Sequence, residues 1–215
     1  MINNKVFLVV LLLISCPLLA QNTQVQAEPI IEKTVQKYNA LSSFSLNFSM
    51  KMEENKTQIQ HLSGSLVVKK EKYLLSFEDQ IIANDGKMIW NYQKSTNEAS
   101  LFEIDDDDDF SLFHPTKMLK NWKQDFTVKF IREETLQKKR VDIVDLTFKK
   151  KTPFYKMRLF IDKTTSMIQQ IKMYEMDGAV ITYAISKFTP NAAVSDAKFT
   201  FNKNDFPNVQ IIDMR

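Results

Sequence analysis

Residues 81–92 read IIANDGKMIWNY, a stretch that combines a turn signal with a strand signal. Asp85-Gly86 is the strongest short hairpin signal in the chain, because both central residues of a type I′ turn need a positive φ, which Asp-Gly tolerates. Met88, Trp90 and Tyr92 follow at a period of two, so they point to one face of a strand. The stretch predicts a hairpin with a large apolar face, which covers either a packed core or a hollow.

Strands continue on both sides of this hairpin. The clearest is residues 44–52, where large apolar side chains alternate strictly with Ser, Asn and Lys, giving one apolar and one polar face. Further strands are predicted at residues 62–68, 73–77, 101–104, 126–130, 141–148, 155–161, 167–174, 180–188 and 199–201, with a second Asp-Gly turn at 177–178. Successive strands with short turns and no crossover helices predict one antiparallel meander.

Two helical segments accompany the strands. Residues 28–40 place Ile31, Val35 and Tyr38 at i, i+4 and i+7, the spacing of an apolar helix stripe, with Pro29 in the first turn. Residues 110–122 predict one or two short amphipathic helices in the middle of the chain; their apolar residues are Leu112, Phe113, Met118, Leu119 and Trp122. Five carboxylates, Asp105–Asp109, precede this segment.

The N-terminus is typical of a secretory signal. Lys5 is followed by an apolar run at Val6–Ile14, too short to span a bilayer, and then by a small residue, Ala20, at a cleavage position. We therefore expect a signal peptide at residues 1–20 and a single domain at 21–215. A cut after Ala27 is an alternative, and residues 13–16 (LISC) also resemble a bacterial lipobox that would lipidate Cys16.

Composition excludes several kinds of chemistry. The net charge of +3 is too small to argue for nucleic acid, and three scattered glycines leave no phosphate-binding loop or nucleophile elbow. The two histidines, His61 and His114, form no metal motif. An EF-hand beginning at Asp105 would need Gly and Glu where Phe110 and Thr116 stand. The 26 acidic residues always allow a hydrolytic pair, so a secreted hydrolase stays an alternative without motif support. Sixteen Phe and ten Met fit a surface that accepts variable apolar shapes.

Four segments, in order, resemble the LolA family of outer-membrane lipoprotein carriers. They are LSSF at residues 41–44 with the strand after it, GSLVVKK at 64–70, NDGKMIWNY at 84–92, and DAKFTF at 196–201. The resemblance implies a mainly β fold: an open antiparallel β-barrel, or half-barrel, capped by short helices over an apolar cavity. We name these two helical segments, residues 28–40 and 110–122, the lid.

The resemblance also implies a function and a site. The protein would be a monomeric periplasmic carrier, not an enzyme, with no cofactor and no metal. It would take the acyl chains of lipoproteins from an inner-membrane releasing transporter to an outer-membrane acceptor. We expect the cavity to be lined by Leu46, Phe48, Met50, Leu66, Val68, Leu75, Phe77, Met88 and Trp90, and the lid to contribute Ile31, Val35, Leu112, Phe113, Met118 and Leu119.

Two departures from the family pattern bear on the lid and the C-terminus. The Arg-Pro that follows the second motif in the family, whose Arg holds the lid closed, is replaced by Lys70-Glu71. Lys70 is the candidate for the lid latch, although an ammonium does not reproduce a guanidinium fork. The C-terminal motif continues into residues 202–207 (NKNDFP) in place of Pro-x-Gly, so the last turn differs. A lipid-sensing regulator of the same fold, or an acceptor anchored at Cys16, is the alternative function.

Overall fold

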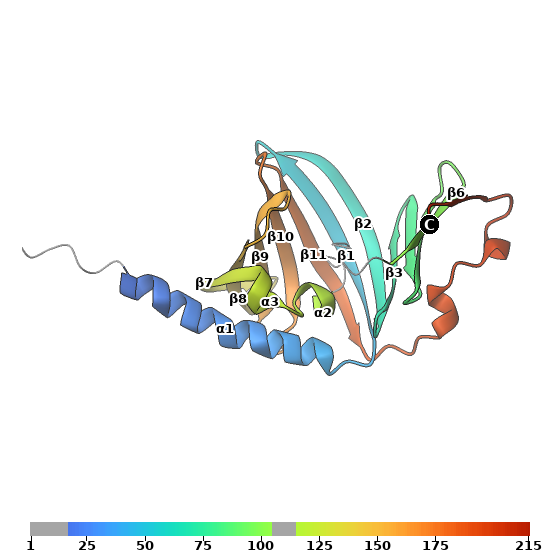
Figure 1. Cartoon of the computed structure of the whole chain (residues 1–215). Helices are drawn as coiled ribbons and strands as arrows, with labels where there is room; N and C mark the ends of the chain where they lie inside the picture. Colours follow the sequence, from blue (N-terminus) through green and yellow to red (C-terminus); the bar gives the residue numbers. More distant parts are fainter. Residues whose placement is uncertain (1–16, 105–114) are drawn as a thin grey trace, which may run out of the picture.

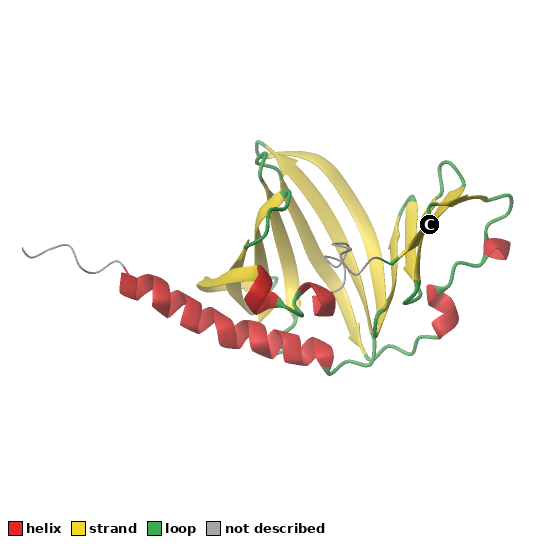
Figure 2. Ribbon diagram, viewed as in Figure 1, coloured by secondary structure: helices red, strands yellow, loops and turns green. Residues whose placement is uncertain are grey.

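The computed structural model describes residues 17–104 and 115–215, which form one large curled sheet with the three α-helices on one side of it (Figure 1, Figure 2). The strands are β1 (Phe44–Glu54), β2 (Thr57–Lys69), β3 (Lys72–Phe77), β4 (Gln80–Asn84), β5 (Met88–Gln93), β6 (Glu98–Glu103), β7 (Phe126–Leu136), β8 (Lys139–Phe148), β9 (Phe154–Asp162), β10 (Ile168–Glu175), β11 (Val180–Pro190) and β12 (Gln210–Asp213). The helices are α1 (Pro17–Asn39), α2 (Pro115–Met118) and α3 (Trp122–Asp125), with 3₁₀ turns η2 (Asp196–Phe199) and η3 (Lys203–Asp205).

The sheet has twelve strands in the order β12-β6-β5-β4-β3-β2-β1-β11-β10-β9-β8-β7. Two runs of consecutive hairpins, β1 to β6 and β7 to β11, are joined where β1 pairs with β11. The sheet does not close on itself, so the connection from β6 to β7 must pass from one side of the opening to the other. That connection contains α2 and α3, which therefore lie across the hollow side of the sheet (Figure 1). The predicted open, mainly β architecture with helical caps is confirmed.

One strand pairing departs from the predicted antiparallel meander. β12 runs parallel to β6, with Ile211 opposite Ala99, and this strand was not predicted. The strand expected at residues 199–201 is wrong, because Phe199 ends the 3₁₀ turn η2 and Phe201 lies in a loop. The chain thus needs a loop after β11 to reach the far edge of the sheet, and only the last residues add a strand there.

The first helix is longer than its apolar spacing predicted. Residues 28–40 were expected, with Pro29 in the first turn, but α1 runs from Pro17 to Asn39 with Pro29 inside it. Proline in a helix interior removes a backbone hydrogen bond. Here Ala27 and Ile31, on either side of Pro29, are both fully buried in the main core, so packing holds the helix together at this point.

The Asp-Gly turn has a different geometry from the one predicted. Only Gly86 has a positive φ, 93°, so the turn is not type I′. Asp85 instead accepts hydrogen bonds through Oδ1 from the backbone N–H groups of Lys87 (2.8 Å) and Met88 (2.9 Å). Paired positive φ values occur where the sequence has no glycine, at the two-residue connections Asn55-Lys56 and Gln137-Lys138.

The main core lies on the side of the sheet that faces the helices. It contains the alternate residues Phe44, Leu46, Phe48 and Met50 of β1, together with Ile31 of α1 and residues of α2 and α3. A second, smaller cluster lies on the opposite face of β4, β5 and β6, where the C-terminal segment covers them. None of the helices within the described ranges combines the length and the apolar character needed to cross a membrane.

Candidate functional site

A hollow of about 670 Å³, counted out to where it opens to solvent, lies between the sheet and the helices α1 and α2. It is lined by Tyr38, Leu46, Phe48, Leu66, Pro115, Met118, Phe154, Ile168, Ile171, Met173, Tyr183 and Ile185. Among the residues that the structure describes, none of these lining side chains carries a charge. The hollow can therefore take up an apolar chain, but its walls offer no pair of carboxylates for acid–base chemistry.

The sheet register brings the two halves of the chain together at this hollow. β1 pairs with β11 so that Phe48 lies opposite Ile185 and Met50 opposite Tyr183, and β10 continues the same surface with Ile171 opposite Tyr183. Since side chains alternate between the faces of a strand, these residues form one continuous apolar wall. The rings of Phe48 and Tyr183 lie 6.1 Å apart within it.

Gly64 provides the space that Phe48 occupies. These two residues are direct neighbours across β1 and β2. A Cβ atom on Gly64 would lie 2.6 Å from the end of the Phe48 ring and 2.9 Å from the backbone oxygen of Ser76. The glycine is needed here for close approach, not for an unusual backbone conformation, and it sets how far the Phe48 ring protrudes into the hollow.

The helices close part of the hollow and are held by charged pairs at its rim. Pro115 and Met118 of α2 line the hollow. Lys117 of α2 lies 3.2 Å from Glu71 in the turn between β2 and β3, and Lys123 of α3 lies 2.7 Å from Glu32 of α1. These side chains are partly or largely exposed, so each pair contributes little to stability. The pairs instead define the position of α2 and α3 at the rim of the hollow.

Lys70, the expected lid latch, occupies the same turn with a φ of 56°. The ion pair between this turn and α2 is made by the next residue, Glu71. A role for Lys70 itself stays a prediction.

Two tyrosines supply the polar atoms of the wall. Burial raises the pKa of both hydroxyls, that of Tyr183 to about 12, with Glu175 adding a smaller upward effect there. Both groups therefore stay protonated at neutral pH and can act as hydrogen-bond donors.

The expected cavity residues separate into three groups. Leu46, Phe48 and Leu66 line the hollow, as does Met118 of the lid. Met50, Val68, Leu75, Ile31 and Leu119 are buried in the main core, and Phe77 and Val35 pack against it, without lining the hollow itself. Leu112 and Phe113, like Asp105–Asp109, lie outside the described residues.

Trp90 and Met88 were assigned to the wrong face of the sheet. The ring of Trp90 stacks on Phe201 at 4.9 Å, in the cluster that the C-terminal segment covers. Ile89, the residue between them, is the one buried in the main core. Alternation along β5 then places Met88 on the same outer face as Trp90. The large apolar face of the hairpin thus covers the C-terminal segment and not the hollow.

Sequence reasoning missed most of the wall that the second half of the chain provides. Ile171, Met173, Tyr183 and Ile185 show the period of two that identifies their strands, but only the pairing of β1 with β11 shows which face they share with Phe48. Tyr38 was recognised in the helix stripe without being assigned to the cavity.

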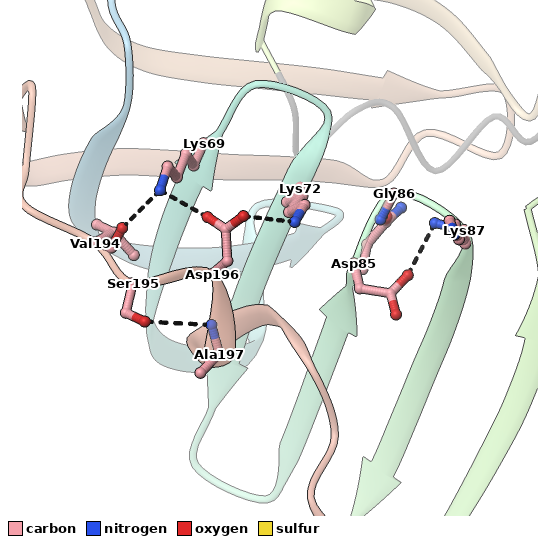
Figure 3. A network of polar contacts seen from close by, with 10 residues as sticks. Lys69, Lys72, Asp85, Gly86, Lys87, Val194, Ser195, Asp196 and Ala197 are labelled. Carbon is pink, nitrogen blue, oxygen red and sulfur yellow. Dashed lines mark hydrogen bonds and ion pairs between the residues drawn. The ribbon is translucent and has the colours of Figure 1, made fainter.

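Residues of three motifs that suggested the resemblance, those at 64–70, 84–92 and 196–201, lie near one another (Figure 3). Asp196 accepts hydrogen bonds from Lys69 (2.6 Å) and Lys72 (2.9 Å), which flank the turn between β2 and β3. The Lys69 ammonium also donates to the backbone oxygen of Val194 at 2.9 Å. Gly86 of the Asp-Gly turn approaches the Lys72 side chain, since a Cβ on Gly86 would lie 3.8 Å from it. These contacts anchor the C-terminal segment to the sheet. The hollow is lined by Leu66 of the second motif and by Leu46 and Phe48 of the strand that follows the first.

The part of the chain described holds no group of three or more His, Cys, Asp or Glu residues placed to hold a metal ion. The buried carboxylate of Asp145 accepts two hydrogen bonds from Arg158, and Lys156 lies 3.4 Å from it. This is a satisfied structural network, because its cations neutralise the carboxylate.

Comparisons with known proteins agree with this fold. The family described as outer membrane lipoprotein carrier protein LolA matches residues 39–202. The uncharacterized protein MJ0687 of Methanocaldococcus jannaschii is 28% identical over 181 residues, which are 83% of this chain; the chain spans about half, 52%, of that relative's length.

The architecture is shared with one solved structure, and a second comparison is weaker. An uncharacterized conserved protein from Thermus thermophilus superposes with a TM-score of 0.59 at 11% identity, over 86% of this chain and 98% of that one. A LolA superfamily protein from Nitrosomonas europaea gives a TM-score of 0.43 at 13% identity, over 81% and 97% of the two chains.

Proposed function

The chain belongs to the LolA family of outer membrane lipoprotein carrier proteins, and on that premise we propose that its hollow binds the acyl chains of lipoproteins and carries them across the periplasm. The family is named for a carrier, and the uncharged wall described above gives no support for hydrolysis. The partners that this function requires are a transporter that releases lipoproteins at the inner membrane and an acceptor at the outer membrane.

One observation carries the proposal: an apolar hollow is left unfilled in the main core. Protein interiors are packed to the density of organic crystals, so a space lined by Phe, Leu, Ile and Met inside the core is an exception that suits an apolar ligand. The 670 Å³ includes space open to solvent, and the part that the centre of a water-sized sphere can reach is about 70 Å³. This is several times the space one water needs, and an acyl chain enters by moving the flexible side chains of the wall apart. The flexible side chains of Met118 and Met173 can adapt to chains of different shape.

A charge placed in the wall tests this proposal. In Leu66→Glu, the carboxylate would face the apolar chain, and burying it against hydrocarbon is strongly unfavourable. We expect binding of an acylated lipoprotein to fall at least tenfold, measured by capture of a purified lipoprotein from detergent solution. The matched control is Ile59→Glu on the same strand, where the native side chain is 53% exposed; its binding should equal that of the wild type. Normal binding by folded Leu66→Glu protein would contradict the carrier function.

We also propose that residues 1–20 are a signal peptide and that the mature domain begins at Gln21. Ala27 is fully buried in the main core, so a cut after Ala27 would remove a core residue. Mass spectrometry of the protein purified from the periplasm would measure the mature N-terminus. A lipidated N-terminus at Cys16 would instead identify an anchored acceptor.

Native mass spectrometry of the same material distinguishes the remaining functions. A co-purified acylated protein supports the carrier. Free lipid without protein cargo would favour a lipid-sensing regulator.

A further inference from the structure

The Tyr38 hydroxyl is buried without a partner. Its side chain is 1% exposed, and the oxygen forms no hydrogen bond with any atom of residues 17–104 or 115–215. Buried polar groups in native proteins are nearly always satisfied, so an exception requires an explanation. Tyr92 shows the usual solution in this chain, because its buried hydroxyl donates to Asn97 Oδ1 at 3.1 Å.

The position of the Tyr38 ring is fixed by its neighbours. Phe44 and Phe188 meet it edge-on, with ring centroids at 5.6 Å and 6.0 Å. Tyr38 lines the hollow together with Ile168. The Ile168 backbone lies close enough to the hydroxyl to lower its pKa slightly against the larger effect of burial, but not in hydrogen-bonding geometry. Tyr38 thus belongs to the wall of the hollow, but its hydroxyl oxygen is itself closed off from solvent, so a ligand reaches it only when neighbouring side chains of the wall move aside.

Packing alone does not account for this residue. Phenylalanine would fill the same space and make the same ring contacts without burying an unsatisfied hydroxyl, which is costly. The raised pKa keeps the group protonated, so it offers a hydrogen that no described group of the protein accepts.

We propose that the Tyr38 hydroxyl donates a hydrogen bond to an acyl carbonyl oxygen of the ligand, so that the hollow selects acyl esters or amides over plain hydrocarbon chains. This inference rests on the proposed function, because it requires a chain in the hollow. It adds a polar anchor that fixes how deep the chain enters: the carbonyl lies at Tyr38, and the hydrocarbon extends along Phe48, Met173 and Ile185.

Competition for the hollow measures this selectivity. Methyl laurate and tetradecane have nearly equal length but differ in the carbonyl, and each would displace a bound apolar fluorescent dye. Comparing the ratio of the two dissociation constants between proteins cancels the difference in water solubility. We expect Tyr38→Phe to lower the preference for the ester about fivefold, the effect of one hydrogen bond. Tyr92→Phe, on the outer face, should leave the preference unchanged.

The outcomes separate this inference from the proposed function. An unchanged ester preference in Tyr38→Phe would overturn the hydrogen bond while apolar binding stands. Displacement by neither probe in the wild type would overturn both. N-methyl lauramide, used as a third probe, identifies the preferred carbonyl: tighter binding of the amide or of the ester, lost in Tyr38→Phe, supports the proposal in either case.

Thermal melting provides a second test that does not depend on the dye. Without ligand, Tyr38→Phe should melt at a higher temperature than the wild type, because it removes an unsatisfied buried group. Tyr92→Phe should melt lower, because it loses a hydrogen bond and leaves Asn97 without that donor. A lower melting temperature for ligand-free Tyr38→Phe would show that the hydroxyl is already satisfied, and would overturn the proposal.

Discussion

The contact between Gly64 and the Phe48 ring decides how much of the hollow stays open. Gly64→Ala would place a Cβ 2.6 Å from the ring, closer than real Cβ atoms approach their neighbours. The ring must move, and the space available to it is the hollow that it already lines. We expect binding of an apolar dye to weaken at least fivefold and stability to fall by about 1–3 kcal/mol, the usual cost of overpacking.

The double variant Gly64→Ala/Phe48→Leu is the control for this prediction. Leucine is shorter than phenylalanine and leaves room for the added methyl group. Dye titration and thermal melting should show partial recovery of binding. If the double variant binds as weakly as Gly64→Ala, the strain lies in the contact with the Ser76 backbone and not in the ring.

Single residues also show why the site could be predicted only in part. Alternation along residues 44–52 placed Leu46 and Phe48 on one apolar face, and the family resemblance assigned that face to a cavity; both residues line the hollow. The same pattern in β5 is equally regular, yet it assigned Trp90 to the wrong face, because both faces of this strand are covered by apolar groups. Periodicity identifies which residues share a face; it does not identify what lies against that face.

Among the elements, the C-terminal segment is held to the sheet by Asp196. Hydrogen bonds first from Lys69 and then from Lys72 lower the pKa of Asp196 to about 2. Because its folded pKa lies below the unfolded value of about 3.9, the stabilisation is fully present above pH 4 and is lost as pH falls through 2. We expect Asp196→Asn to lower the melting temperature by a few degrees at most at pH 7, and by progressively less below pH 4.

The same substitution in a variant that lacks both lysines shows whether Lys69 and Lys72 cause this pH dependence. When Lys69→Met and Lys72→Met are already present, adding Asp196→Asn should change the melting temperature little at any pH. An undiminished effect would mean that Asp196 stabilises the segment by another route, such as the backbone of the 3₁₀ turn η2.

The limits of prediction differ between kinds of element. Most of the strands were predictable, because a strand with one solvent-exposed and one buried face has apolar residues at every second position. Turn geometry was not, because hydrogen bonds accepted by side chains such as Asp85 select a turn that the Asp-Gly pair alone does not specify. β12 could not be predicted either, since its four residues pair with β6, which is distant in the sequence.

At the scale of the whole molecule, the open sheet explains why the site is covered by helices. The chain must pass between the two edges of the sheet after β6, and α2 lies on that path, with Lys117 near Glu71. Three acyl chains, roughly 45 methylenes, would contribute about 35 kcal/mol if fully removed from water, at about 0.8 kcal/mol each. That exceeds the practical ceiling of about 20 kcal/mol for noncovalent binding. Partial shelter, followed by direct transfer to another apolar site, is therefore the workable arrangement.

Ligand exchange should then require α2 to move away from the sheet. The only cysteine of the sequence, Cys16, lies in the expected signal peptide, so Glu71→Cys/Lys117→Cys introduces the sole pair of thiols into a chain that begins at Gln21. A short bismaleimide linking them should slow dye exchange at least tenfold, because it holds α2 against the turn between β2 and β3. Each single cysteine variant, treated with the same reagent, should exchange at the wild-type rate. Stopped-flow mixing of dye-loaded protein with excess empty protein measures the rate. Equal rates with and without the link would show that the chain leaves by a route that does not pass α2.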